Sequence, residues 1–180
     1  MNNRENLRSE ILSFLKDKEE KVMFIKGTYQ HEKHRELLRV LMKSSDPGTN
    51  VLLRLNGKEN IKSMLTEGIA KKGLNTRIKL KNINLYIDTL NCRTWKGGNY
   101  NIVIIYPIDP LCRDKEKTRK EVMENLSKKV IDKLFIVSWT DHYDYSWLEK
   151  YNIDRTVTFD AEEEDKAYHG RVLDLLRKYK

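Results

Sequence analysis

The segment VMFIKGTYQHEKHRELLRVLM, residues 22–42, contains the change of pattern that decides the fold. Its first five residues form a short apolar run that ends at Gly27, which is typical of a buried strand. Apolar side chains then recur at helical spacing, and they are Leu37, Leu38, Leu41 and Met42. The segment therefore predicts a strand, a loop and an amphipathic helix that packs back on the strand.

The same alternation continues on both sides of this segment. Further strands are expected at 51–55, 102–106, 134–138 and 156–159, and a hairpin or two successive strands at 77–80 and 83–87. Amphipathic helices are expected at 1–20, 61–69, 114–131 and 145–151, and a closing helix carries the stripe Tyr168, Val172, Leu175, Leu176 and Tyr179. Short apolar strands between amphipathic helices predict an α/β fold, a three-layer α/β/α sandwich with a mainly parallel central sheet.

Length and composition narrow the class of protein. The 180 residues suit one α/β domain, 1–180. Charged residues make up 34% of the chain, and the apolar runs are too short to cross a membrane, so a cytoplasmic protein is expected. Cys92 and Cys112 are too few for a disulfide framework. His31 and His34 lack a third ligand placed by the sequence, so no metal site is expected.

Positive charge is concentrated in one part of the chain. The formal net charge is +8, and residues 54–81 contain eight basic and two acidic side chains. The candidate contacts for an acidic partner, either nucleic acid or an acidic protein, are Lys58, Lys62, Lys71, Lys72 and Arg77. Clustered lysine and arginine favour such partners through counterion release. A solvated lysine-rich surface is the alternative.

The loop after the first strand resembles the phosphate-binding loop G-x-x-x-x-G-K-[ST]. Gly27 and Lys33 occupy the opening glycine and the lysine in the right register. Glu32 stands at the second glycine, and His34 stands at the hydroxyl position. The segment thus resembles a degenerate member of the P-loop NTPases.

That resemblance implies a nucleotide site with ATP or GTP and magnesium as the candidate ligands. Gly27 and the following N–H groups would cradle phosphate, Lys33 would neutralise it, and His34 would replace the magnesium-binding hydroxyl. Asp88, at the end of an apolar strand, or its rival Asp109 would organise magnesium or water. Asp141 follows a later strand, where related proteins carry a base-reading or sensor loop.

The departures from the motif predict weak or absent hydrolysis. A Glu32 carboxylate 4 Å from a phosphate charge would cost on the order of 4 kcal/mol at an effective dielectric near 20, unless Glu32 turns away or is paired. Glu32 also suits a first helical turn with no ligand at all. Two function classes therefore stay open: a P-loop-like nucleotide-binding domain, and a non-catalytic α/β module that binds nucleic acid or another acidic partner. Whether the chain is an enzyme is left open.

Overall fold

The sheet has the mainly parallel architecture that the sequence predicts. The structure is a computed structural model that describes residues 2–65 and 67–178. Within these residues, seven strands form one sheet in the order β3-β4-β2-β5-β6-β1-β7. Every neighbouring pair is parallel except β3 and β4. The strands are β1 Val22–Lys26, β2 Thr49–Leu55, β3 Ile78–Leu80, β4 Ile83–Thr89, β5 Tyr100–Tyr106, β6 Val130–Val137 and β7 Arg155–Thr158.

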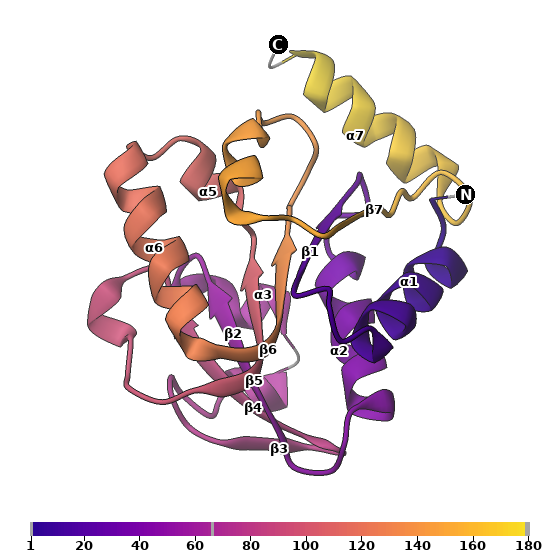
Figure 1. Ribbon diagram of the computed structural model, residues 1–180. Coiled ribbons are helices and arrows are strands. Elements are labelled where there is room, and N and C mark those ends of the chain that lie inside the picture. The colour runs from indigo at the N-terminus through magenta and orange to yellow at the C-terminus, as the bar shows by residue number, and fades with distance from the viewer. Residues whose placement is uncertain (1, 66, 179–180) are drawn as a thin grey trace.

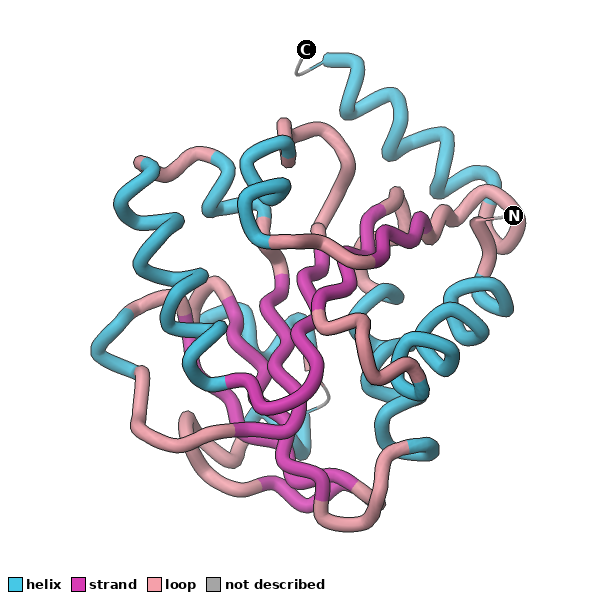
Figure 2. Tube along the Cα trace, viewed as in Figure 1, coloured by secondary structure: helices cyan, strands magenta, loops and turns pink. Residues whose placement is uncertain are grey.

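Helices cover both faces of the sheet (Figures 1 and 2). One face carries α1 and α2 with α3, and the other carries α5 and α6 with the 3-10 helix η3. The remaining helical segments are α4, α7, η1 and η2. The helical segments together are α1 Arg4–Lys16, α2 Glu32–Ser44, η1 Lys58–Asn60, α3 Ile61–Met64, α4 Glu67–Ala70, η2 Cys92–Thr94, α5 Asp109–Cys112, α6 Glu116–Lys129, η3 Ser146–Tyr151 and α7 Lys166–Lys178.

Strand β5 explains why two helical layers form. Ile102, Ile104 and Tyr106 pack into the core on the α1–α2 side. Val103 and Ile105 point to the opposite face and pack with α5 and α6. Because successive strand residues alternate between faces, an uninterrupted apolar run needs cover on both sides.

Two expectations differ from the observed elements. The stripe at 61–69 does not form one helix, because Leu65 leaves α3 with extended backbone (φ −121°, ψ 163°). Its side chain nevertheless reaches the core, so burial of apolar side chains outweighs the continuation of the helix. The helix expected over 1–20 spans Arg4–Lys16. Tyr179, expected in the closing helix, lies outside the described residues.

The hairpin between β3 and β4 forms as one of the two expected arrangements. Ile78 pairs with Leu85 and Leu80 pairs with Ile83 in an antiparallel register. Lys81 adopts φ 49° between the two strands, as tight hairpin turns require. Among the described residues, no helix combines the length and the apolar character needed to span a bilayer.

Candidate functional site

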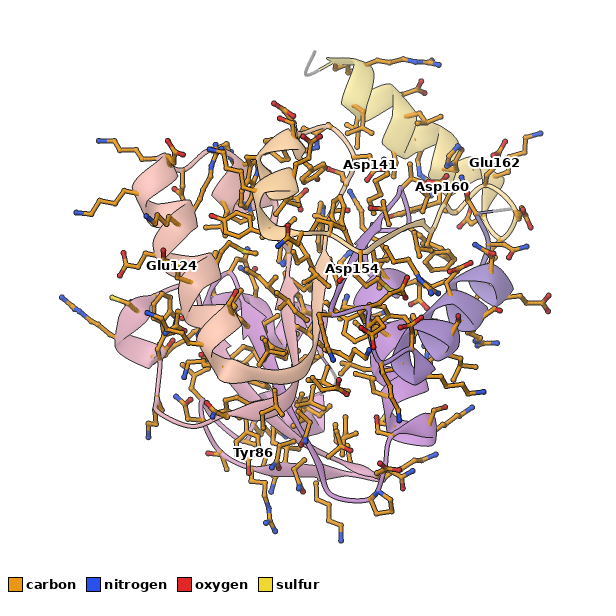
Figure 3. All side chains as sticks on the ribbon, viewed as in Figure 1. Tyr86, Glu124, Asp141, Asp154, Asp160 and Glu162 are labelled. Carbon is orange, nitrogen blue, oxygen red and sulfur yellow. The ribbon has the colours of Figure 1, made fainter. Side chains whose placement is uncertain are left out.

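The strand order determines which loops meet at the carboxyl edge of the sheet. β1 lies between β6 and β7, so the loops that follow these three strands are neighbours. Figure 3 shows Asp141, after β6, and Asp160, after β7, close together near one end of α7, whereas Tyr86 lies toward the opposite end of the molecule. In parallel α/β sheets this edge is where ligands bind.

Gly27 is fixed by its packing against the end of β7. Its φ is +122°, and a Cβ placed there would lie 2.1 Å from the carbonyl oxygen of Phe159. Its N–H donates a 2.7 Å hydrogen bond to Oδ1 of Asp141. The first glycine of the motif is therefore required by local backbone geometry, whether or not a phosphate binds.

The next N–H of the loop is also bonded to a carboxylate. The Thr28 N–H donates to Oδ1 of Asp160 at 2.9 Å, and the Thr28 hydroxyl lies 3.1 Å from the same oxygen. Nδ1 of His169, in α7, lies 2.8 Å from that hydroxyl. The loop is thereby tied to the segment that leads into α7.

Lys33 points back into the loop and is completely buried. Its ammonium group donates to the carbonyl oxygen of Gly27 and, at 3.0 Å, to that of Trp139. Burial lowers the pKa of Lys33 to about 8, while the charges of Asp141 and Asp109 act in the opposite direction. The lysine of the motif thus bridges the β1 and β6 loops from within.

Asp109 holds the loop after β6 in place. Its carboxylate accepts hydrogen bonds from the N–H groups of Trp139 at 2.6 Å and Thr140 at 3.1 Å. The Tyr145 hydroxyl donates to it at 3.2 Å. Asp109 and Lys33 therefore meet at the Trp139–Thr140 peptide, and Asp141 joins them through Gly27.

Glu32 turns away from the loop and pairs with arginines. Its oxygens lie 3.0 Å from Arg4, 3.2 Å from Arg35 and 3.0 Å from Arg39. Although burial opposes the effect, hydrogen bonds from Arg39, Arg4 and Arg35 lower the pKa of Glu32. Because the Glu32 carboxylate is paired with arginines, the repulsion expected between Glu32 and a bound phosphate does not apply.

The same arginines hold a second, more deeply buried carboxylate. Glu36 is 1% exposed and lies 2.5 Å from Arg8, 2.6 Å from Arg4 and 2.9 Å from Arg39. Burial raises its pKa, but the hydrogen bonds from these arginines outweigh burial and lower the pKa of Glu36 to about 2. Ion pairs to Arg4 and Arg8 dock α1 on α2, so the first turns of α2 serve the packing of helices.

His34 lies in the core rather than in the loop. Its Nε2 donates to the carbonyl oxygen of Met64 at 2.8 Å, and its ring stacks on Tyr106 at 4.1 Å. Burial lowers the pKa of His34 to about 4. A neutral imidazole with this orientation connects α2 to α3.

Asp88 is separated from the Gly27 loop by the sheet order. Three strands, β6, β5 and β2, lie between β1 and β4. The Asp88 carboxylate receives two hydrogen bonds from Arg54, at 2.8 and 2.6 Å, and both side chains are buried. Trp95 covers the guanidinium, with its ring centre 4.3 Å from Cζ of Arg54. Asp88 and Lys33 share the carboxyl edge of the sheet, but they belong to different clusters.

The basic residues expected to contact an acidic partner surround α3, α4 and β3. All five are exposed, and they are Lys58, Lys62, Lys71, Lys72 and Arg77. Lys71 lies 2.8 Å from Glu67 in an exposed ion pair, which contributes little to stability. This group of residues is called the basic patch below.

Asp160, which also contacts the loop, was not among the site residues expected from the sequence. Five of the six residues 160–165 are acidic, and this acidic run suits the N-terminus of the helix that follows it. Asp160 also directly follows the last expected strand, and Asp141 lies three residues after another one. Position after a parallel strand is the signal that brings both carboxylates to the loop. No three His, Cys, Asp or Glu side chains gather as a metal site in the described parts of the chain.

Comparison with known proteins supports the fold. No protein-family model matches the chain, and no curated protein sequence does. The solved structure of the large terminase from a thermophilic bacteriophage is similar, with a TM-score of 0.52 and 11% sequence identity. The alignment covers 97% of this chain and 50% of the terminase chain, so this protein spans half the length of that structure. At this identity the likeness concerns the fold alone, an α/β fold with one mainly parallel sheet between helical layers.

Proposed function

We propose that this protein is a P-loop-like domain that acts by binding a partner and does not hydrolyse nucleotides. The observation that carries the proposal is the pair of hydrogen bonds from Gly27 N–H to Asp141 and from Thr28 N–H to Asp160. Backbone N–H groups of a phosphate loop work by donating to phosphate oxygens. Here carboxylate oxygens of the same chain already accept these hydrogen bonds.

The lysine and the hydroxyl position support the same proposal. Lys33 donates to two carbonyl oxygens inside the protein, and a bound phosphate would have to replace at least one of them. His34 is committed to Met64 and Tyr106, and an imidazole is a poor ligand for magnesium. The residues present therefore do not fit a magnesium nucleotide in this arrangement, and no hydrolytic step is derived for it.

Thermal unfolding with ATP or GTP, each with and without magnesium, tests this proposal. A ligand present at 100 times its dissociation constant stabilises a protein by about 2.7 kcal/mol, which corresponds to roughly 5–10 °C for a protein of this size. We expect no shift beyond that of magnesium alone and no phosphate release. A magnesium-dependent shift with either nucleotide would overturn the proposal.

The partner of such a module is expected to be acidic, either nucleic acid or another acidic macromolecule. The specific observation is that the five side chains of the basic patch are all exposed, in the segment that runs from η1 to the edge strand β3. Binding to a generic DNA duplex should be independent of sequence and fall steeply with salt, since counterion release drives it.

Neutralising Lys71, Lys72 and Arg77 together tests the patch. The triple alanine variant should bind an acidic partner more weakly and with a shallower salt dependence. Its matched control is the alanine variant of three exposed basic residues on α6, namely Lys117, Lys120 and Lys128. Equal loss of affinity in both variants would show that net charge, rather than this patch, controls binding.

A further inference from the structure

An open groove of about 570 Å³ lies between α2 and the segment formed by α3, α4 and β3. Its rim carries Arg35 and Arg39. Its floor is entirely aliphatic or thioether, and consists of Leu38, Met42, Met64, Leu65, Ile69 and Leu80. We call this feature the α2 groove.

Half of the floor of the α2 groove is buried, namely Leu38, Met64 and Leu65. Met42, Ile69 and Leu80 are partly buried and pack on the main cluster between the sheet and α2. The cover next to α2 consists of two helices of only four residues each, α3 and α4. An apolar groove bounded by charged residues has the form that an amphipathic helix needs for docking. Methionine side chains adapt to varied apolar partners, as helix-binding surfaces require.

The rim of the groove is positively charged and has free hydrogen-bond donors. Arg35 and Arg39 are 43% and 45% exposed and form ion pairs with Glu32 and Glu36 through Nη1. Their Nε and Nη2 groups have no acceptor among the described residues. Lys62 of the basic patch lies two residues before Met64, Lys72 lies three residues after Ile69, and both lysines are exposed.

We propose that the α2 groove binds an acidic amphipathic helix of a partner protein. Aliphatic side chains at i, i+3, i+4 and i+7 of the helix would fill the floor. Its carboxylates would pair with the arginine forks of the rim and with the exposed Lys62 and Lys72. This inference rests on the acidic-partner role proposed above and specifies the class of partner.

The lining favours a protein helix over nucleic acid. No aromatic side chain is among the residues that line the groove, and single-stranded nucleic acid binds by stacking its bases on aromatic side chains. A duplex backbone would contact the rim and leave the apolar floor exposed. Only a partner that carries both aliphatic and acidic groups complements the whole surface.

A second copy of this chain fits less well. An isologous dimer through the groove would place one arginine rim beside the other, and the formal net charge of +8 adds repulsion. The acidic run could complement the rim, but Asp160 and Glu164 are already paired with Asn2 and Arg4 of their own chain.

Methionine methyl groups provide a direct readout of the groove. Met42 and Met64 line it, whereas Met23 and Met123 are fully buried elsewhere. In protein labelled with ¹³C at the methionine methyls, we would titrate a peptide of about 18 residues, five helical turns, with leucine at i, i+3, i+4 and i+7 and glutamate on the other face. A peptide of identical composition with the leucines dispersed around the helix is the control.

We expect the amphipathic peptide to shift the Met42 and Met64 signals with saturation, and the dispersed peptide to leave them unchanged. The inference is overturned if neither signal moves, or if both peptides act alike. It is also overturned if a DNA duplex moves these two signals instead. Concentration-dependent shifts without peptide, together with a doubled sedimentation mass, would assign the groove to a second copy.

Charge variants separate this inference from the proposed function. Lys62→Glu with Lys72→Glu should weaken peptide binding at least about tenfold at low salt, while Lys117→Glu with Lys128→Glu, on α6, should change it less than about twofold. If the peptide fails but salt-dependent duplex binding at the basic patch persists, only the helix inference is wrong. If both the peptide and the duplex fail to bind, the acidic-partner role falls as well.

Discussion

The Gly27 N–H donates to Oδ1 of Asp141 at 2.7 Å across 114 positions of sequence. The bond joins the end of β1 to the loop after β6, at the point where a phosphate loop would present its first donor. Because Lys33 lies beneath the same loop and donates to the Gly27 carbonyl, the motif residues form a closed internal network.

Asp141→Ala should destabilise the protein by about 1–3 kcal/mol, because it leaves the Gly27 N–H buried without an acceptor. Asp141→Asn retains an acceptor and should cost less. Denaturant unfolding at neutral pH measures both variants. Glu162→Ala, in the neighbouring loop and exposed, is the control and should lie within about 0.5 kcal/mol of the wild type. Equal stability of Asp141→Ala and the control would contradict the closed network.

Gly27→Ala should cost at least about 2 kcal/mol, because of the positive φ and the contact with the Phe159 carbonyl. Gly97→Ala is the matched control, since a Cβ there meets no atom within 4 Å. It should be neutral within about 0.5 kcal/mol. If both alanine variants unfold at the same denaturant concentration, packing against Phe159 is not the reason for a glycine at position 27.

Stability should fall as the pH is lowered from 7 to 5. Burial lowers the pKa of His34 to about 4 from an unfolded value of 6.5, so the unfolded chain binds the proton first. The stabilisation is therefore present above pH 6.5 and is lost as the pH falls toward 4. Protonation of His34 in the unfolded chain should lower the free energy of unfolding by about 2 kcal/mol between pH 7 and pH 5.

His34→Gln should flatten this part of the stability profile. Burial also lowers the pKa of His31, so His31→Gln is measured beside it. The Glu36 carboxylate, with a pKa of about 2, loses its stabilisation only below pH 4.5 and stays outside the window. A profile for His34→Gln that parallels the wild type between pH 5 and 7 would show that the imidazole is not buried in the neutral form.

Breaking the Arg54–Asp88 pair should be strongly destabilising. Either Arg54→Met or Asp88→Leu leaves one buried charge without its partner, which costs about 3–5 kcal/mol. The double variant should be more stable than the sum of the single effects predicts, because no unpaired charge remains. Additive effects in denaturant unfolding would mean that the two side chains do not interact as a pair.

Local pattern was sufficient to predict much of the fold but little of the site. The β1–loop–α2 unit follows from the apolar spacing within residues 22–42, a single short stretch of the chain. The contacts Gly27–Asp141 and Thr28–Asp160 span 114 and 132 positions, and only the strand order brings them together. Asp88 and Asp109 both follow apolar strands, so the sequence could not rank them, whereas the order β1-β6-β5-β2-β4 separates Asp88 from the loop.

Restoring the motif residues should not restore a nucleotide site. Glu32→Gly with His34→Thr rebuilds the glycine and the hydroxyl, but the wild-type Glu32 is paired with arginines rather than directed at a phosphate. The change removes those ion pairs and leaves the Met64 carbonyl without its donor. We therefore expect a loss of stability on the order of 3 kcal/mol and no binding of ATP or GTP with magnesium in calorimetry.

A second double variant tests whether Asp141 and Asp160, rather than the motif residues, prevent nucleotide binding. Asp141→Asn with Asp160→Asn keeps acceptors for the Gly27 and Thr28 N–H groups but removes two negative charges from the place where a phosphate would lie. If the carboxylates of Asp141 and Asp160 exclude phosphate from the loop, this variant should bind a nucleoside triphosphate more tightly than the variant with the rebuilt motif. It alone removes the negative charges of these two side chains. Calorimetry on both folded variants compares them directly. Nucleotide binding by the Glu32 and His34 variant alone would mean that the motif residues, rather than Asp141 and Asp160, keep the loop empty.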